Sequence, residues 1–176
     1  HIEHRLDLFI PEEIQHIIEL GDALVLSEGK IKNNKIDYNI RNSRIAWIHP
    51  SPSTWWLFDK AIMVFKNSRP FNSRPFNSLQ SMQYTLYDSK GAHYGWHKDI
   101  GSSDSIAKSR ANVAIIQLSD PNDYKGGVLQ IKHEDEIIDV MKTKGMVTTF
   151  PIDLEHRVTP IISGVRKTLI MWGLQK

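Results

Sequence analysis

The sequence predicts a mainly β fold, a sandwich or jelly roll of short strands with N-terminal helices packed on one sheet. Two observations support this prediction. Apolar residues at helical spacing occur only in the N-terminal part of the chain. From Gln80 onward, short β-rich segments separated by turn residues follow one another at roughly ten-residue spacing. We therefore expect a single domain over residues 1–176, with a helical support region over about 1–79 and a jelly-roll core over about 80–176.

Two helices are expected in the support region. The first covers about residues 11–20, where a proline and two acids precede apolar residues at helical spacing and Gly21 provides a stop. The second lies within "PSTWWLFDKAIMVFKN", residues 52–67, which begins with serine and threonine capping candidates. Its two tryptophans, Trp55 and Trp56, are expected to pack in the core rather than to form a stacking platform for nucleic-acid bases.

The rest of the N-terminal part is predicted to be strand and loop. Residues 45–48 have the composition of a strand. Residues 67–78, "NSRPFNSRPFNS", repeat a five-residue unit whose prolines exclude a continuous helix or a central strand, so we expect a surface loop. Its Arg69 and Arg74 could contact an acidic partner.

Strands dominate the chain after residue 80. The predicted strands are "MQYTLYD", "NVAIIQLSD", "GGVLQIK", "EIIDVM", "MVTTF" and "RKTLIMW". No helical period of useful length remains in this part of the chain, so the helices must pack from outside on a β core.

The composition limits the chemistry of the chain and its location. The chain has no cysteine, so any metal must be bound by nitrogen and oxygen ligands, and zinc thiolates and iron–sulfur clusters are excluded. A net charge of +2 with 24% charged residues is too balanced to indicate nucleic-acid or membrane binding by itself. No apolar run approaches the roughly 20 residues of a membrane span, and the N-terminus lacks the pattern of a signal peptide. We expect a cytoplasmic protein that does not bind membranes.

The stretch "HYGWHKDIG", residues 93–101, indicates a metal site. On a strand, His97 and Asp99 point to the same face and Lys98 points away, so the His-x-Asp pair would provide two ligands. His93 and His97 would converge only on a helix, which the neighbouring glycines disfavour, so His93 is expected at the rim of the site. A third ligand must then come from another strand.

Two histidines and one carboxylate form a ligand set that leaves metal positions open and suits non-heme Fe(II). The candidates for the third ligand are His133, in a charged turn region where a solvated histidine is the better interpretation, and His156, near the end of an apolar strand. Arg166 follows ten residues after His156 and opens the apolar strand "RKTLIMW". An arginine inside an apolar barrel needs a buried anion, and its guanidinium would suit the far carboxylate of a dicarboxylic acid.

Three segments, "YDSKGAHYGWHKD", "GGVLQI" and "HRVTPIISGVRKTLIMW", resemble the Fe(II)/2-oxoglutarate-dependent oxygenases of the prolyl 4-hydroxylase-like group, which includes the PKHD-type hydroxylases of bacteria and phages. The resemblance covers about residues 80–176 and extends weakly into the N-terminal helices. It implies a double-stranded β-helix, or jelly roll, with residues 80–176 as the catalytic core. Gly126 and Gly127 match a turn where the backbone comes close, and Trp172 is expected to pack in the core.

The resemblance also implies roles for individual side chains. It implies iron ligation by His97, Asp99 and His156, and binding of the C5 carboxylate of 2-oxoglutarate by Arg166. The other implied residues of the cosubstrate pocket are Tyr87, Tyr94, Thr168 and Gln117. Some relatives have a tyrosine where this chain has Gln117, and an amide could still donate a hydrogen bond there.

The activity implied by the resemblance is that of a dioxygenase using Fe(II), 2-oxoglutarate and O2 to hydroxylate a peptidyl residue. Succinate and CO2 would be co-products, and ascorbate would have a supporting role. Prolyl 4-hydroxylation, as by procollagen-proline 4-dioxygenase, is the favoured reaction, so the expected partner is a proline-containing peptide or protein. Asp99 must stay ionised and both histidine ligands neutral, so activity should fall on acidification.

Other functions stay open. Hydroxylation of a free amino acid or another small molecule uses the same chemistry, because substrate choice lies in loops, here residues 28–44, 67–78 and 101–110. An oxidative demethylase of nucleic acid is less favoured. Although "YGWHKD" also resembles that group, the segment after His156 lacks the expected pair of arginines. A metal-stabilised binding module without activity is a further alternative, and the oligomeric state and the stereochemistry are open.

Overall fold

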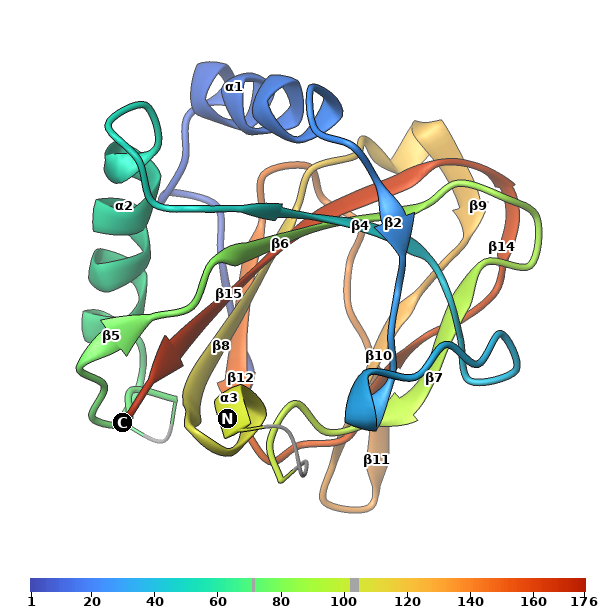
Figure 1. The fold of residues 1–176 in the computed structure, drawn as a ribbon. Coiled ribbons are helices and arrows are strands. Elements are labelled where there is room, and N and C mark those ends of the chain that lie inside the picture. The colour runs from blue at the N-terminus through green and yellow to red at the C-terminus, as the bar shows by residue number, and fades with distance from the viewer. Residues whose placement is uncertain (71, 102–104) are drawn as a thin grey trace.

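The structure is a computed structural model that describes residues 1–70, 72–101 and 105–176, and it contains two facing antiparallel sheets (Figure 1). The larger sheet has the order β1 (Glu3–Arg5), β12 (Val147–Pro151), β8 (Arg110–Gln117), β15 (Arg166–Leu174), β6 (Met82–Tyr87), β4 (Arg44–Ile48) and β2 (Ser27–Glu28), and β5 (Ser78–Leu79) also pairs with β15. The smaller sheet has the order β11 (Glu136–Asp139), β10 (Leu129–His133), β13 (His156–Val158), β7 (His93–His97) and β3 (Arg41–Asn42). Strands β9 (Tyr124–Gly126) and β14 (Ile161–Gly164) form a separate pair. The mainly β class predicted from the sequence is confirmed.

Two long helices, α1 (Pro11–Asp22) and α2 (Trp55–Lys66), cover the outer face of the larger sheet (Figure 1). Both lie where the spacing of apolar residues predicts them. The apolar core between the helices and the sheet includes Ile14, Ile17, Leu57, Phe65, Tyr84, Ile116 and Leu169. The remaining helical elements are short: η1 (Lys32–Asn34), α3 (Ser105–Lys108) and η2 (Pro121–Asp123).

Gly21 does not end the first helix, because α1 continues to Asp22. A Cβ atom on Gly21 would lie 2.5 Å from ring atoms of Tyr84 in β6, so the missing side chain makes room for this ring. The Tyr84 hydroxyl then donates a hydrogen bond to Asp22 at 2.5 Å. The glycine therefore allows close packing of α1 on the sheet and is not a helix stop.

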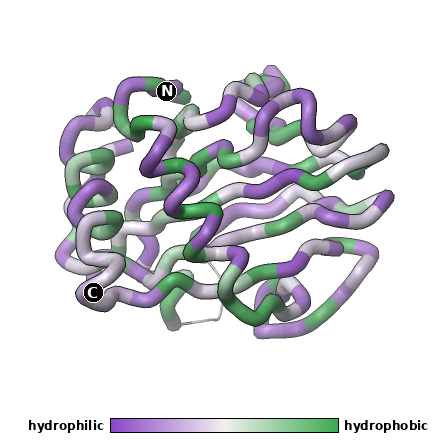
Figure 2. The backbone as a smooth tube through the Cα atoms, turned by 90° about the horizontal axis from the view of Figure 1, so that it is seen from above, coloured by the Kyte–Doolittle hydropathy of each residue, from purple (hydrophilic) through white to green (hydrophobic). Residues whose placement is uncertain are grey.

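The space between the two sheets holds a second core and a cavity. Strand β6 is buried along its whole length, because the helices cover one face of the larger sheet and the smaller sheet covers the other. Hydrophobic and hydrophilic residues alternate over short distances along the chain (Figure 2), as strands at the boundary of a core require. The second core includes Val113, Ile115, Leu129, Ile131, Phe150, Val158 and Trp172.

Residues 1–79 contribute strands as well as helices. Strands β1, β2 and β4 extend the larger sheet and β3 forms an edge of the smaller sheet, whereas the sequence indicated only residues 45–48. Trp55 is 58% exposed, so the prediction of core packing is wrong for this residue. Trp56 is half-buried and stacks on His16 with ring centroids 5.2 Å apart. Among the described residues, no helix has both the length and the apolar character needed to cross a membrane.

The tandem repeat forms a loop that leads into β5. Phe71, within this repeat, lies outside the described residues. Asn72 is buried, and its carbonyl oxygen accepts a hydrogen bond of 2.7 Å from the side chain of Asn112 in β8. The arginines of the repeat form ion pairs within the chain, Arg69 with Glu3 at 3.4 Å and Arg74 with Asp153 at 3.8 Å. The loop therefore docks on the larger sheet.

We expect Gly126→Ala to destabilise the fold more than Gly91→Ala does. Both glycines have positive φ angles, +72° and +85°, which cost about 1–2 kcal/mol with a Cβ present. At Gly126 the Cβ would also lie 2.3 Å from the carbonyl oxygen of Pro160, whereas Gly91 has no atom within 4 Å. This clash should add about 1–3 kcal/mol to the loss in unfolding free energy. Urea unfolding measures both variants, and equal losses would contradict the close approach.

Candidate active site

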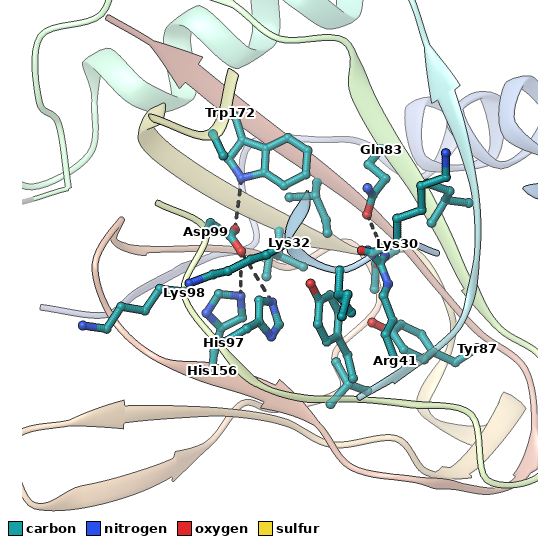
Figure 3. Close-up of a pocket in the computed structure, with 18 of the residues that line it drawn as sticks. Lys30, Lys32, Arg41, Gln83, Tyr87, His97, Lys98, Asp99, His156 and Trp172 are labelled. Atoms are coloured by element: carbon teal, nitrogen blue, oxygen red, sulfur yellow. Dashed lines mark hydrogen bonds and ion pairs between the residues drawn. The ribbon is translucent and has the colours of Figure 1, made fainter. Parts of the chain in front are cut away.

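A cavity of about 260 Å³ lies between the two sheets and opens to the surface beside the segment that links β2 to β3. Figure 3 shows His97, Asp99 and His156 on one side of this cavity and Arg41 and Tyr87 on the other. The lining therefore combines residues from both sheets with residues from the N-terminal part of the chain.

The predicted metal ligands meet in this cavity. His97 and His156 lie directly opposite each other in the antiparallel pair of β7 and β13, which brings their imidazoles together. The Nε2 atoms of His97 and His156 lie 3.5 Å and 3.3 Å from Oδ1 of Asp99. One ligand atom from each residue lies within 4.8 Å of the others, and this is the only such group of three among the described residues.

Asp99 reaches this position by a route that strand alternation did not predict. Strand β7 ends at His97, and Asp99 lies in a bend two residues later. Its Oδ2 accepts a hydrogen bond of 3.0 Å from the indole of Trp172 in β15. Its backbone oxygen accepts one of 3.2 Å from Arg110. Trp172 is in the core as predicted, but its contact with Asp99 had no local signal in the sequence.

The imidazoles are oriented by the backbone. Nδ1 of His97 lies 2.7 Å from the carbonyl oxygen of Gly95, and Nδ1 of His156 lies 3.1 Å from that of Leu154. A carbonyl can only accept, so both Nδ1 atoms carry hydrogen, and in the neutral imidazole each Nε2 atom has a lone pair available to a metal. Two imidazole nitrogens and one carboxylate oxygen are a donor set that fits non-heme Fe(II) with open positions.

The three side chains of the group shift one another's pKa values. Burial alone would raise the pKa of Asp99, but the charge of His156 and hydrogen bonds from both histidines hold it well below its usual range. Burial and the charge of His156 lower the pKa of His97 to about 4. Burial also acts to lower the pKa of His156, but the Asp99 carboxylate outweighs it and the pKa is raised. A metal ion and a proton therefore compete for Nε2 of His156.

We expect the affinity for a divalent metal to fall as the pH falls through the raised pKa of His156. Below that pKa His156 is protonated and cannot ligate, whereas the lowered pKa keeps His97 neutral. Release of one proton per metal ion changes the affinity about tenfold per pH unit. Calorimetric titration with Mn(II) in buffers of different ionisation enthalpy counts the released protons. Binding without proton release would argue against this assignment.

Tyr94 forms a wall of the cavity because β7 contains a bulge. Between the pairs His156–His97 and Val158–Tyr94, one residue of β13 opposes two residues of β7, so Tyr94 and His97 come to the same face. Their rings stack with centroids 3.6 Å apart and planes 9° apart. Regular alternation would have put them on opposite faces. A contact of Tyr94 with the cosubstrate stays a prediction.

Arg166 lines the same cavity as the histidines, is 3% exposed and lies beside Tyr87, which Figure 3 shows on the side away from the metal group. Its Cα partner on β6 is Tyr87, and its guanidinium lies 5.3 Å from the centre of that ring. Thr168, two residues further along β15, lines the same cavity. No carboxylate among the described residues pairs with Arg166, and a buried cation without a partner favours an anionic ligand.

Gln117 does not line the main cavity but a small adjoining one, to which Arg166 also contributes. Its side-chain nitrogen donates to the Tyr124 hydroxyl at 2.9 Å and to the Ser119 carbonyl at 3.1 Å. Both amide hydrogens are therefore engaged, and donation to 2-oxoglutarate would require one of these bonds to change. The contact stays a prediction, and Tyr124 is a neighbour of Arg166 that sequence reasoning missed.

Two other histidines lie outside the metal group, and the candidate substrate loops differ in what they contribute to the cavity. His93 bonds to the carbonyl oxygens of Gly91 and Asn39, both at 3.1 Å, and His133 is near the ring of His1; neither belongs to the metal group. The segment over residues 28–44 contributes Lys30, Ile31, Lys32, Asn34 and Arg41 to the cavity, and residues 101–110 contribute Ala107 and Arg110. Residues 102–104 lie outside the described part of the chain, and the described part of the repeat adds nothing to the lining.

Trp172→Phe should weaken metal binding without comparable loss of fold. The change removes the indole N–H that donates to Oδ2 of Asp99 and keeps an aromatic ring in the core. Outer hydrogen bonds of this kind typically contribute about 10–100-fold in metal affinity, and we expect a Mn(II) affinity lower by that factor. Trp47→Phe is the matched control, because Trp47 lines the same cavity 6.2 Å from Trp172 and does not donate to Asp99. Equal effects of the two variants would assign Trp172 to packing alone.

A family model described as the 2OG-Fe(II) oxygenase superfamily matches residues 82–173, a range that contains every predicted site residue. The chain belongs to the 2OG-Fe(II) oxygenase superfamily. Membership implies Fe(II) and 2-oxoglutarate as cofactor and cosubstrate, and the donor set of His97, Asp99 and His156 fits the iron.

The similar curated proteins are PKHD-type hydroxylases, as the resemblance implied. One from Azoarcus sp. is 33% identical over 92 residues, which cover 51% of this chain and 40% of the relative. One from Nitrosomonas eutropha is 32% identical over 111 residues, which cover 61% of this chain and 49% of the relative. The matched part of the chain thus spans half or less of the length of these relatives.

Solved structures confirm the predicted double-stranded β-helix. A prolyl hydroxylase from Trichoplax adhaerens, in complex with a peptide fragment of the hypoxia inducible factor oxygen degradation domain, has a TM-score of 0.81 and 18% identity, covering 98% of this chain and 83% of that one. A prolyl-4-hydroxylase from Pseudomonas putida has a TM-score of 0.75 and 18% identity, covering 99% and 92%. At these identities the likeness concerns the fold.

Proposed function

We propose that the chain is an Fe(II)- and 2-oxoglutarate-dependent dioxygenase that hydroxylates a peptidyl residue, most specifically proline at C4. One observation carries the proposal. Three ligand atoms of His97, Asp99 and His156 converge in the same cavity as a buried arginine, Arg166, that has no acidic partner among the described residues. A metal site and a carboxylate site in one cavity are what a metal-chelating keto acid with a second carboxylate needs.

The chain's own residues would bind and orient the reactants. The metal would be held by His97, Asp99 and His156, with Tyr94 beside it. Arg166 would bind the distal carboxylate of 2-oxoglutarate, next to Tyr87 and Thr168. Bound Fe(II), with 2-oxoglutarate and O2, would supply the oxidation that hydroxylates the substrate and releases succinate and CO2. Ascorbate would support repeated turnover. The apolar core around the cavity would limit access of bulk water.

The peptide substrate is supported by the neighbouring proteins. The Trichoplax adhaerens neighbour is a prolyl hydroxylase solved with a peptide, and the Pseudomonas putida neighbour is a prolyl-4-hydroxylase. In this chain the cavity opens to the surface, as modification of a residue within a peptide requires. We also propose that residues 1–176 act as one domain, because strands from residues 1–79 complete sheets whose other strands come from residues 80–176.

The test is turnover of 2-oxoglutarate by protein supplied with Fe(II), ascorbate and O2, with succinate as the product measured. We expect succinate formation to rise when proline-containing peptides are added, and mass spectrometry should find one added oxygen on the proline. Free proline and methylated oligonucleotides serve as parallel additions. Stimulation by free proline or by methylated oligonucleotides, and not by the peptides, would contradict the proposal of a peptide substrate. Absence of succinate under all conditions would contradict the proposed dioxygenase activity.

A further inference from the structure

The cations around the cavity far outnumber the acids. The cationic residues in its lining are Lys30, Lys32, Arg41, Lys98, Arg110 and Arg166. Among the described residues, the acid in this lining is Asp99, which would be a ligand of the proposed metal. The whole chain has a net charge of only +2, so positive charge is concentrated at this opening.

Cations elsewhere in the described part of the chain are commonly paired with acids. The ion pairs formed by lysine and arginine are Arg5–Asp7, Arg44–Asp88, Lys60–Glu13, Arg69–Glu3, Arg74–Asp153, Lys132–Glu155 and Lys167–Asp22. Lys30, Lys32, Arg41 and Lys98 form no ion pair with any described residue. The cavity and its rim therefore bring together four cations that have no ion pair with a described residue.

Arg41 is the most informative of these cations, because it is only 4% exposed. Its guanidinium donates to the Ser43 hydroxyl at 2.7 Å, the Lys30 carbonyl at 2.9 Å and the Gln83 side-chain oxygen at 3.0 Å. All three acceptors are neutral, and the remaining contact is with the ring of Tyr94, 4.4 Å away. A cation buried among neutral acceptors keeps its charge uncompensated until an anion binds nearby.

The proposed cofactor and cosubstrate do not neutralise this charge. Asp99 and the chelating carboxylate of 2-oxoglutarate together balance the two charges of a divalent metal. The distal carboxylate balances Arg166. Arg41 and the lysines of the segment between β2 and β3 are then still unmatched while the cavity remains open toward the substrate.

We propose that the substrate is an acidic peptide, in which a carboxylate close to the target residue binds Arg41, with Lys30 and Lys32 attracting the flanking acids. This inference rests on the proposed function and specifies its substrate. Lys30 and Lys32 lie on the exposed segment at the opening, and Arg41 lies buried beside Tyr94, across the cavity from the metal group (Figure 3).

A peptide fits these observations better than a nucleic acid does. A nucleic-acid strand carries a phosphate on every nucleotide and is bound by basic residues that follow its backbone over a long track. Here many cations away from the cavity are held in ion pairs with acids. The segment beside the opening also exposes the apolar side chains of Ile36, Tyr38 and Ile40, which suit contact with peptide side chains.

The test is binding of synthetic peptides to protein loaded with Mn(II) and 2-oxoglutarate under anaerobic conditions, measured by calorimetry. The peptides share one proline-containing sequence and differ only in the flanking positions, which are glutamate, glutamine or lysine. We expect the glutamate peptide to bind at least about tenfold more tightly than the glutamine peptide, and the advantage to shrink with added salt. The lysine peptide should bind most weakly.

Variants of the cations then locate the effect. Lys30→Gln/Lys32→Gln should remove most of the advantage of the glutamate peptide, and these exposed positions should tolerate the change. Arg41→Gln should remove the rest if the variant folds. Lys125→Gln/Lys144→Gln is the matched control, because it removes the same charge from exposed residues that do not line the cavity.

Equal binding of the glutamate and glutamine peptides would overturn the inference, and so would an advantage that survives in Lys30→Gln/Lys32→Gln. Tight binding of a single-stranded oligonucleotide with no binding of the glutamate peptide would overturn it in favour of nucleic acid. Binding of 2-oxoglutarate to the Mn(II)-loaded protein is measured before any peptide is added. Failure at that step counts against the proposed function, whereas a lost charge preference with that step intact counts against the acidic peptide alone.

Discussion

The His156→Ala variant is expected to lose tight binding of divalent metal, with an affinity for Mn(II) at least about 100-fold weaker than that of the unmodified protein. His156 is buried, lies opposite His97 across the strand pair, and points Nε2 at Asp99. Without it, one imidazole and one carboxylate remain, and they cannot complete the ligand set. Succinate formation should be abolished in the same variant.

His97→Ala provides a second test, because removal of the buried His156 ring also leaves a void next to Phe150. His93→Ala is the matched control, since His93 lies on the same strand and bonds only to backbone carbonyls. Calorimetry and the electron paramagnetic resonance of bound Mn(II) measure the affinity, and circular dichroism checks the fold. Unchanged Mn(II) affinity in either ligand variant would remove that residue from the metal site.

The Arg166→Met variant is expected to bind 2-oxoglutarate about 30–4,000-fold more weakly, because a buried carboxylate loses its charged partner at a cost of about 2–5 kcal/mol. The ligand-free variant should be at least as stable as the unmodified protein. Arg166 is 3% exposed and has no acidic partner among the described residues, so methionine removes an uncompensated charge while it fills similar space. Loss of binding together with gain in stability is the signature of a ligand-binding cation.

Lys167→Gln is the control for Arg166, because the adjacent side chain points to the opposite face of β15 and pairs with Asp22 at 2.9 Å. It should leave 2-oxoglutarate binding unchanged. Arg166→Lys should be intermediate, since it keeps the charge but loses the two-pronged geometry of the guanidinium. Calorimetric titration of the Mn(II)-loaded proteins with 2-oxoglutarate and thermal unfolding without ligand give the two readings. Unaltered 2-oxoglutarate affinity in Arg166→Met would assign the carboxylate to another cation.

Local sequence patterns were sufficient to predict the longer helices and strands. Both long helices were predictable, and so were the strands β6, β8, β10, β11, β12 and β15, because each has enough residues for its spacing of apolar side chains to be distinctive. The short strands β1, β2, β3 and β9 were not predictable, since each has only two or three residues and exists through its pairing with a distant strand. Gly21 was read as a helix stop because its partner, the ring of Tyr84, is far away in the sequence.

In the candidate site, too, some features were predictable from the sequence and others depend on the tertiary structure. By itself the sequence determined the kinds of ligand available, the His-x-Asp spacing, the arginine that opens an apolar strand, and the resemblance to an oxygenase family. Only the tertiary structure decided that His156 faces His97, that Trp172 holds Asp99 beyond the end of its strand, and that Arg41 turns into the cavity. The physical reason is that strand register, bulges and burial depend on partners remote in the chain, whereas residue type and spacing are local.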